Sequence, residues 1–171
     1  TSQYTLSLHD ALPICAGGES AETIGGWSSY QGGPHSNQYS GLTQIDTANV
    51  EELEVAWTYA TGDARQDPPS TIECNPIVVD GTLYGSSPRL KVFAIDAATG
   101  EERWIYDPFD GERASGVNRG VMHWSGDEGE RILFTAEEYL YALDAGTGRL
   151  IASFGDSGRV DLTEGLDRDV E

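Results

Sequence analysis

The chain has 171 residues, of which 38% are hydrophobic, with four Trp and eight Tyr, a composition typical of one globular domain. Its 29 Asp and Glu against 10 Lys and Arg give a formal net charge of −19, which repels nucleic-acid phosphates and anionic lipid surfaces. No apolar run reaches the roughly 18 residues of a membrane-spanning helix, and the two cysteines, Cys15 and Cys74, are too few to imply a disulfide framework.

The first 16 residues differ from the rest of the chain. They contain no initiating Met, no basic region and no clean apolar core, so they make a poor signal peptide. They resemble translated sequencing-adapter text, and the alternative is the tail of a genuine leader with a cleavage site near residues 11–17. We therefore expect residues 1–16 to be non-native or leader sequence. Residues 17–171 are expected to be the N-terminal part of one incomplete domain.

The rest of the chain is predicted to consist of short strands and turns, with little helix. Its 21 Gly and 7 Pro favour many turns. The dipeptide Asp80-Gly81 separates two apolar runs and predicts a two-residue hairpin. In chain order, strands are predicted at 55–60, 76–80, 82–86, 91–96, 103–106, 120–124, 131–135, 140–144 and 150–154.

A short segment occurs twice at a fixed distance. Residues 94–100 (AIDAATG) return as residues 142–148 (ALDAGTG), 48 positions further along. A weaker upstream copy places Trp57 at 47 positions before Trp104. A period of roughly 40–50 residues built from strands predicts the blades of a β-propeller. The chain would contain about three blade-length repeats, which are too few to close a ring.

The residue types of the repeat indicate structural roles. Asp and Thr side chains can bond to backbone groups within a turn, and Gly supplies a positive φ without steric cost. We therefore expect Asp96 and Asp144 to stabilise turns at the ends of their strands. Trp57 and Trp104 are expected to pack between blades and not to stack on a ligand.

A series of longer motifs runs from residue 27 to the end of the chain. It comprises Trp27…Tyr30-x-Gly32-Gly33, Tyr39-Ser40-x-Leu42-x-Gln44-Ile45, Asn49-Val50…Leu53-x-x-Ala56-Trp57, Glu73-Cys74-Asn75-Pro76, Asp107-Pro108, Asn118-Arg119-Gly120 and Phe154-Gly155-x-x-Gly158-x-Val160-Asp161-Leu162. This ordered series resembles the quinoprotein dehydrogenases, which use pyrroloquinoline quinone (PQQ). The last stretch fits the branch of membrane glucose dehydrogenase better than the branch of methanol dehydrogenase.

This resemblance implies an all-β fold, a β-propeller with eight blades in the complete protein. It also implies PQQ near the central axis, a calcium ion beside it as Lewis acid, and an aspartate as general base. In that chemistry the base takes the proton of a sugar or alcohol hydroxyl while hydride passes to the quinone. In the family the calcium ligands and the aspartate come from later blades. We therefore expect no catalytic residue and no metal ligand up to residue 171.

The resemblance also indicates five residues as contacts of the cofactor, whose three carboxylates require cationic partners. Glu73 matches the family glutamate that bonds the quinone, and the alternative is a solvated loop residue. Lys91 matches a cation near the quinone, and Arg89 competes with it because the alignment of this loop is ambiguous by a residue or two. Arg119 either faces the cofactor or ties two blades together. Thr135 matches a threonine that bonds a quinone carboxylate.

One departure from the family pattern concerns cysteine. Relatives of the methanol type have two adjacent cysteines beside the quinone, whereas this region of the chain has only Cys74. Together with the missing later blades, this leaves the active site incomplete. We expect the isolated 171-residue chain neither to retain the quinone tightly nor to turn over substrate.

The dehydrogenase interpretation implies particular partners and a location. Electrons would pass from a sugar or alcohol to a respiratory acceptor such as ubiquinone or a cytochrome, in the periplasm. A membrane anchor could lie in an N-terminal segment missing from this chain. The rival interpretation is a non-catalytic propeller scaffold related to outer-membrane assembly lipoproteins, which share the repeat but not the positions of Glu73 and Arg119. A third interpretation is an assembly artefact that is never made as a stable protein.

Overall fold

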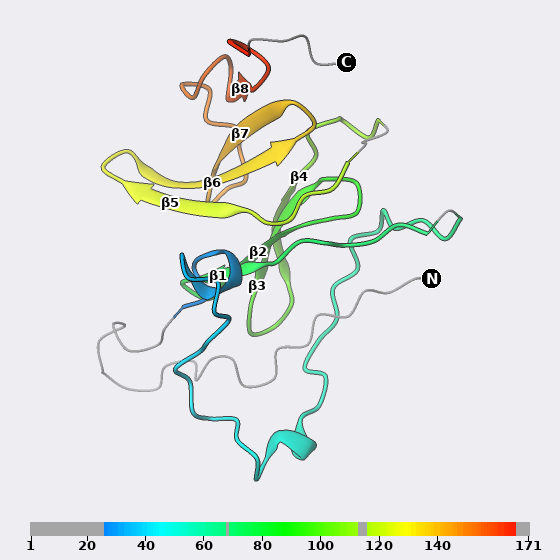
Figure 1. Cartoon of the computed structure of the whole chain (residues 1–171). Coiled ribbons are helices and arrows are strands. Elements are labelled where there is room, and N and C mark those ends of the chain that lie inside the picture. Colours follow the sequence, from blue (N-terminus) through cyan, green and yellow to red (C-terminus); the bar gives the residue numbers. More distant parts are fainter. Residues whose placement is uncertain (1–25, 68, 113–115, 167–171) are drawn as a thin grey trace.

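The computed structural model describes residues 26–67, 69–112 and 116–166, and these residues adopt an all-β fold (Figure 1). Within them the strands form two four-stranded antiparallel sheets, each ordered as in the sequence. The first sheet contains β1 (Ile77–Val79), β2 (Thr82–Ser86), β3 (Val92–Asp96) and β4 (Glu102–Tyr106). The second contains β5 (Met122–Gly126), β6 (Gly129–Ala136), β7 (Tyr139–Asp144) and β8 (Arg159–Asp161). Four antiparallel strands in sequence order form the unit of a propeller blade.

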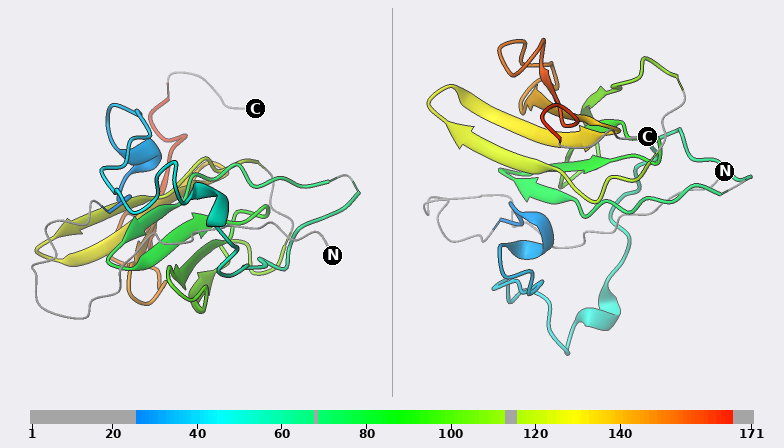
Figure 2. Two further views of the ribbon diagram at one scale, coloured as in Figure 1. Left: turned by 90° about the horizontal axis from the view of Figure 1, so that it is seen from below. Right: turned by 45° about the horizontal axis from the view of Figure 1, so that its top comes forward.

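Two short 3-10 helices precede the sheets in the described part of the chain. The first, η1 (Tyr30–Gly32), lies beside the first sheet, whereas η2 (Val50–Glu52) stands apart from both sheets (Figure 2). Over the described ranges, no helix combines the length and the apolar character needed to cross a bilayer. The predicted non-native or leader segment, residues 1–16, lies outside the described residues.

Seven of the nine predicted strands are present, each with ends within two residues of the prediction. The predicted hairpin is also confirmed, because Val79 at the end of β1 pairs with Thr82 at the start of β2. Both turn residues have positive φ, 45° at Asp80 and 72° at Gly81. Positive φ at both central positions is typical of a type I′ turn, whose twist matches that of the flanking strands. Local turn chemistry thus sets the register of β1 and β2.

The predicted strand at 55–60 is absent, so the first of the three repeats contributes a segment without a sheet. Strands need hydrogen-bonding neighbours, and none of the described strands pairs with this segment. Trp57 in this segment nevertheless makes the same hydrogen bond as its counterpart in the next repeat, Trp104. The indole Nε1 of Trp57 donates to the carbonyl of Ala97 at 3.2 Å. In the next repeat Trp104 Nε1 donates in the same way to the carbonyl of Ala145 at 2.9 Å.

The predicted strand at 150–154 is wrong, because the fourth strand of the second sheet is interrupted. The Ile151 amide donates to the Ala142 carbonyl at 3.0 Å, so pairing with β7 begins where it was expected. The chain then leaves the sheet and returns as β8, which pairs with residues 139–141. Gly155 and Gly158, in the excursion between, have φ values of 55° and 97°. Such values favour glycine and are incompatible with a continuous strand.

The main hydrophobic core lies between the two sheets. From the first sheet, the rings of Tyr84 and Trp104 lie 5.9 Å apart between centroids. From the second, Phe134 and Tyr141 stack at 5.0 Å. Burial of these apolar faces against each other holds the sheets together. The buried members of this core are Ile77, Tyr84, Leu90, Val92, Ala94, Trp104, Val121, Ile132, Phe134, Ala136, Tyr141, Leu143 and Ala145.

The aspartates of the repeat have the structural role that was predicted. Asp96 Oδ1 accepts hydrogen bonds from the amides of Ala98 and Thr99, both at 3.0 Å. Asp144 Oδ1 accepts from the amide of Thr147 at 2.8 Å and from its hydroxyl at 2.6 Å. Each aspartate therefore closes the turn that follows its own strand.

Asp96 is expected to make the stability of the fold depend on pH. The hydrogen bond from the Arg103 guanidinium, 2.8 Å between Nη2 and Oδ2, and the bonds from the turn amides hold the pKa of Asp96 below its usual range. A carboxyl with a lowered pKa stabilises the fold above the unfolded-state pKa of about 3.9, and this contribution is lost as the pH falls through the folded-state pKa. In urea unfolding, Asp96→Asn should therefore be less stable than the parent at about pH 7, with a difference that shrinks below about pH 4.

A second substitution tests the cause of this pH dependence. Arg103→Met removes the strongest contact of the Asp96 carboxylate, so its pKa should rise toward the usual value. The acid-induced loss of stability should then be smaller than in the parent and should be complete at a higher pH. A difference between parent and Asp96→Asn that stays constant over the whole pH range would contradict the prediction.

Each tryptophan of the repeat packs against the glycine of the next turn, Trp57 against Gly100 and Trp104 against Gly148, so these positions require glycine. Gly148 has a φ of 69°, and a Cβ atom there would lie 2.6 Å from the ring of Trp104. Gly111 has a similar φ of 87°, but nothing lies within 4 Å of its ideal Cβ. Gly111→Ala should cost about 1–2 kcal/mol of backbone strain, and Gly148→Ala should cost about 1–3 kcal/mol more for the clash. Equal losses in chemical denaturation would show that the ring contact is unimportant.

Candidate functional site

The candidate site is built where the chain enters the first strand of each sheet. Asn75 lies just before β1 and Gly120 just before β5, and the two residues form a parallel β-bridge. The Asn75 amide donates to the carbonyl of Arg119 at 2.9 Å. We call residues 73–75 and 118–120 the entry crossing. It places side chains that are 46 residues apart in the sequence at one junction of the two sheets.

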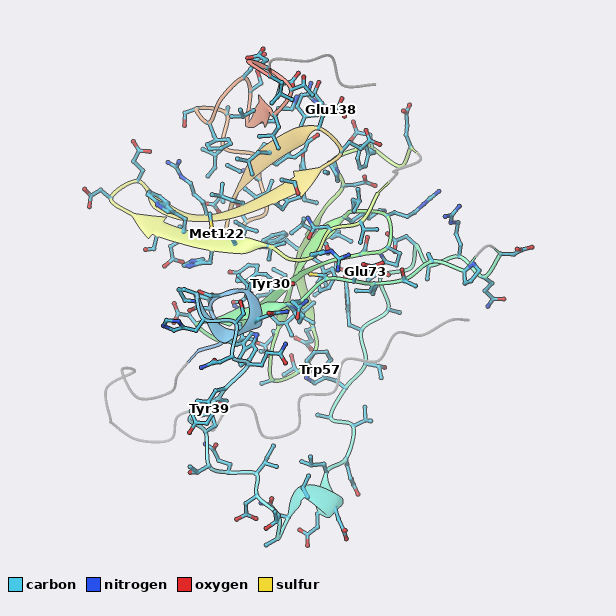
Figure 3. All side chains as sticks on the ribbon, viewed as in Figure 1. Tyr30, Tyr39, Trp57, Glu73, Met122 and Glu138 are labelled. Carbon is cyan, nitrogen blue, oxygen red and sulfur yellow. The ribbon has the colours of Figure 1, made fainter. Side chains whose placement is uncertain are left out.

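Glu73 and Arg119 form an ion pair across the entry crossing. The distance between Arg119 Nη2 and Glu73 Oε2 is 3.4 Å. The Arg119 side chain is 73% exposed and that of Glu73 is 38% exposed, so solvent screens the pair and it contributes little to stability. The guanidinium keeps donors free for another group, and its planar fork suits a carboxylate. Figure 3 shows Glu73 at the junction of the sheets.

Asn118 fixes the chain immediately before Arg119. Its side chain is buried, and Oδ1 accepts from the Gly120 amide at 2.8 Å and from the Ser86 hydroxyl at 3.3 Å. Its Nδ2 donates to the carbonyl of Thr135 at 2.9 Å. The amide thereby ties the entry crossing to the ends of β2 and β6. Asn118 was not predicted from the sequence to have a role, although its place directly before Arg119 was a usable signal.

Thr135 lies near the end of β6, next to this network. Its backbone carbonyl accepts the bond from Asn118, and the residue is exposed. The structure therefore brings Glu73 and Arg119 together and places the backbone of Thr135 next to Asn118, the neighbour of Arg119. An exposed hydroxyl, a carboxylate and a guanidinium together can bind a polar, acidic ligand.

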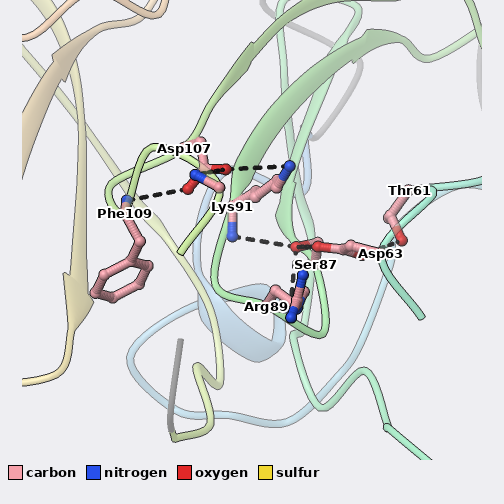
Figure 4. A network of polar contacts seen from close by, with 8 residues as sticks. Thr61, Asp63, Ser87, Arg89, Lys91, Asp107 and Phe109 are labelled. Carbon is pink, nitrogen blue, oxygen red and sulfur yellow. Dashed lines mark hydrogen bonds and ion pairs between the residues drawn. The ribbon is translucent and has the colours of Figure 1, made fainter. Parts of the chain in front are cut away.

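Lys91 and Arg89 belong to a separate polar network on the loop between β2 and β3 (Figure 4). The Ser87 hydroxyl accepts from the amides of Arg89 and Lys91, at 3.3 and 3.1 Å. The same hydroxyl donates to Asp63 Oδ2 at 2.6 Å. The Lys91 ammonium is paired with Asp107 Oδ2 at 3.1 Å. Among the described residues, Lys91 thus has an acidic partner within the chain, and it makes no ion pair with Glu73.

Hydrogen bonds within the fold favour the ionised form of the Asp107 carboxyl. Burial raises the pKa of this carboxyl, but hydrogen bonds from the Phe109 amide and from Lys91 outweigh burial and hold the pKa below its usual range. Asp107 therefore stays ionised at neutral pH and continues to hold the ammonium. The pairing of Lys91 was not anticipated from the sequence, because Asp107 lies 16 positions further along.

Cys74 sits between Glu73 and Asn75 but has a structural environment. Its Sγ accepts a hydrogen bond from the Ser86 amide at 3.3 Å. Burial raises the pKa of the thiol, which makes it a weak nucleophile. No group of three or more His, Cys, Asp or Glu side chains in the described ranges is placed to hold a metal ion.

Comparisons with known proteins agree with this architecture. Residues 27–171 match the PQQ family described as "Glucose/ethanol/alcohol dehydrogenase, beta-propeller domain". The dehydrogenase subunit of the quinone alcohol dehydrogenase from Gluconobacter oxydans (strain 621H) is 37% identical over 136 residues, which are 75% of this chain and 17% of that protein. The quinoprotein glucose dehydrogenase of Escherichia coli (strain K12) is 33% identical over 158 residues, 82% of this chain and 20% of that protein.

Solved structures give the same result. The quinohemoprotein alcohol dehydrogenase from Comamonas testosteroni superimposes with a TM-score of 0.67 at 34% identity, covering 83% of this chain and 20% of that one. A europium-containing methanol dehydrogenase gives a TM-score of 0.58 at 30% identity, covering 73% and 22%. The chain thus spans about a fifth of the length of these relatives. The two sheets correspond to part of a propeller, as predicted from the repeat.

Proposed function

The chain belongs to the β-propeller family of PQQ-dependent glucose, ethanol and alcohol dehydrogenases, and on this premise we propose that it is the N-terminal part of an enzyme that oxidises a hydroxyl group of a sugar or an alcohol. The relatives are named for both substrate classes. The single observation that supports a cofactor-binding role for this part of the chain is the exposed Glu73–Arg119 pair at the entry crossing.

The residues at the entry crossing fit the chemistry of PQQ. Its carboxylates require cationic partners, and the largely exposed guanidinium of Arg119 has donors left after pairing with Glu73. Glu73 supplies an acceptor for an N–H or O–H of the ligand, and Thr135 supplies a hydroxyl. When bound, PQQ provides the two-electron acceptor for the oxidation. The residues of this chain bind and orient it.

A second cation would come from the loop between β2 and β3. Lys91 is held by Asp107 at 3.1 Å. Within the described ranges the Arg89 guanidinium makes no ion pair, so it is the freer of the two cations. We therefore propose that Arg89 contacts the ligand, and that Lys91 contributes only if Asp107 releases it.

The finer assignment concerns the branch of the family. We propose the glucose-dehydrogenase-like branch, because residues 154–162 carry the motif Phe-Gly-x-x-Gly-x-Val-Asp-Leu, which forms the end of the excursion and the whole of β8. The proposal includes calcium as the metal, with ligands and the general-base aspartate supplied beyond residue 171. It also includes a periplasmic location and a respiratory acceptor, ubiquinone or a cytochrome.

The proposal is tested on the full-length protein that contains this segment. The purified apoprotein should bind PQQ in the presence of calcium and then reduce an artificial dye with glucose faster than with ethanol. Omission of PQQ, or chelation of calcium, should abolish dye reduction. A faster rate with ethanol would overturn the branch assignment alone. Failure to bind PQQ would overturn the enzyme interpretation and favour a non-catalytic scaffold.

A further inference from the structure

A segment that precedes both sheets in the sequence lies beside the points where the chain enters β1 and β5. Residues 26–33, which we call the N-terminal strap, contain η1 and are tied to β1 because the Val78 amide donates to the Trp27 carbonyl at 2.8 Å. The strap is compact, since the amide of Gly33 donates to the Tyr30 carbonyl at 3.2 Å. It thus contacts the first sheet directly beside the entry crossing.

The strap also contacts Gly120, which lies just before the second sheet, through the ring of Tyr30. A Cβ atom built on Gly120 would lie 3.1 Å from Cδ2 of Tyr30 and 3.3 Å from the carbonyl oxygen of Asn75. Gly120 is therefore enclosed between the tyrosine ring and the neighbouring entry strand. Its chain neighbour is Arg119, and Asn75 is two residues from Glu73. The ring of Tyr30 therefore packs against the backbone at Gly120, next to Arg119 and close to the strand entry that carries Glu73.

We infer that the N-terminal strap positions the Glu73–Arg119 pair for the cofactor, with Tyr30 as the positioning residue. The inference rests on the proposed function, since it concerns the orientation of groups that would bind PQQ. The aromatic ring of Tyr30, and not its hydroxyl, makes the contact that positions the pair. The Tyr30 hydroxyl accepts an exposed hydrogen bond from Gln31 Nε2 at 3.4 Å. By contrast, Tyr39 is 75% exposed and stands away from both sheets (Figure 3).

The test uses the full-length protein and measures PQQ affinity by titration of the apoprotein. Tyr30→Ala should weaken PQQ binding roughly tenfold, as loss of an orienting partner does at metal sites. Tyr30→Phe, which keeps the ring, should bind within about twofold of the parent. Tyr39→Ala is the matched control and should leave affinity unchanged.

A double-mutant cycle separates positioning from general stability. If Tyr30 acts through Arg119, then Tyr30→Ala should have little further effect on PQQ affinity in an Arg119→Ala background. A purely structural role would weaken binding equally in both backgrounds, and that result would overturn the inference. Parent-like affinity of Tyr30→Ala would also overturn it while leaving the proposed function intact. A parent protein that binds no PQQ would overturn the proposed function and the inference with it.

Gly120→Ala provides an independent variant whose effect does not depend on the folding of Tyr30→Ala. The added methyl group presses on the tyrosine ring from the other side. It should weaken PQQ binding in the parent and less so in the Tyr30→Ala protein, where the ring is gone. Additive effects of the two substitutions would contradict a direct contact.

Discussion

Replacement of Trp104 by alanine should lower the free energy of unfolding by about 3–5 kcal/mol. The residue is 8% exposed and fills the space between the two sheets, so its removal leaves a cavity that both sheets line. The lost hydrogen bond is a smaller part of the effect, because the Ala145 carbonyl also accepts from the Tyr84 hydroxyl at 3.3 Å. Urea unfolding followed by circular dichroism measures the change without relying on tryptophan fluorescence.

Trp124 provides the matched control for this prediction. It is 40% exposed on β5, and the Arg131 guanidinium lies 4.8 Å from its ring centroid. An exposed cation–π contact contributes about 0.5–1 kcal/mol, so Trp124→Ala should be several times less damaging than Trp104→Ala. Similar losses for the two variants would show that the inter-sheet tryptophan does not have the special role assigned to it.

The sheets were predictable because their determinants are local. The turn after β3 needs only Asp96 and the amides of Ala98 and Thr99, all within one short motif. The hairpin at Asp80-Gly81 likewise depends on two adjacent residues that adopt positive φ. A motif repeated at a fixed spacing then implies that each tryptophan contacts the turn of the next repeat in the same way, as Trp57 and Trp104 do.

The errors occurred where structure depends on distant partners. Residues 55–60 carry a strand-like sequence, but a strand exists only beside another strand, and sequence alone does not show whether one is available. The interruption before β8 depends on Gly155, where a Cβ atom would lie 2.2 Å from the Arg159 carbonyl oxygen. That close approach arises only after the excursion has folded back. The strand-like residue types at 150–154 gave no sign of it.

The candidate site was predictable as a set of residues but not as an arrangement. Glu73 and Arg119 were selected independently, and their contact depends on the bridge between Asn75 and Gly120. Lys91 was selected for its charge, yet the folded chain already gives it Asp107 as a partner. Charge and motif position thus indicate which residues can bind a ligand, and only the tertiary fold determines which of them are free to do so.

Arg119→Ala should weaken PQQ binding by the full-length protein roughly 10- to 100-fold, which corresponds to the loss of about 1.5–3 kcal/mol from one charged hydrogen-bonding partner. Arg119→Lys should fall between the parent and Arg119→Ala, because a lysine keeps the charge but loses the planar fork. Neither variant should change the free energy of unfolding by more than about 1 kcal/mol, since the pair with Glu73 is exposed. Both substitutions are therefore expected to lower PQQ affinity with little change in the stability of the fold.

Arg103 is the control for Arg119, because it is another partly exposed arginine that pairs with an acidic residue. It bonds Asp96 in a turn that belongs to the repeat and not to the entry crossing. Arg103→Ala should therefore reduce stability while PQQ affinity remains that of the parent, the reverse of the pattern for Arg119→Ala. If both variants lost affinity equally, the effect would reflect the net charge of the protein. If neither lost affinity, the entry crossing would not be where the cofactor carboxylates bind, and Arg119 would serve to tie one sheet to the next.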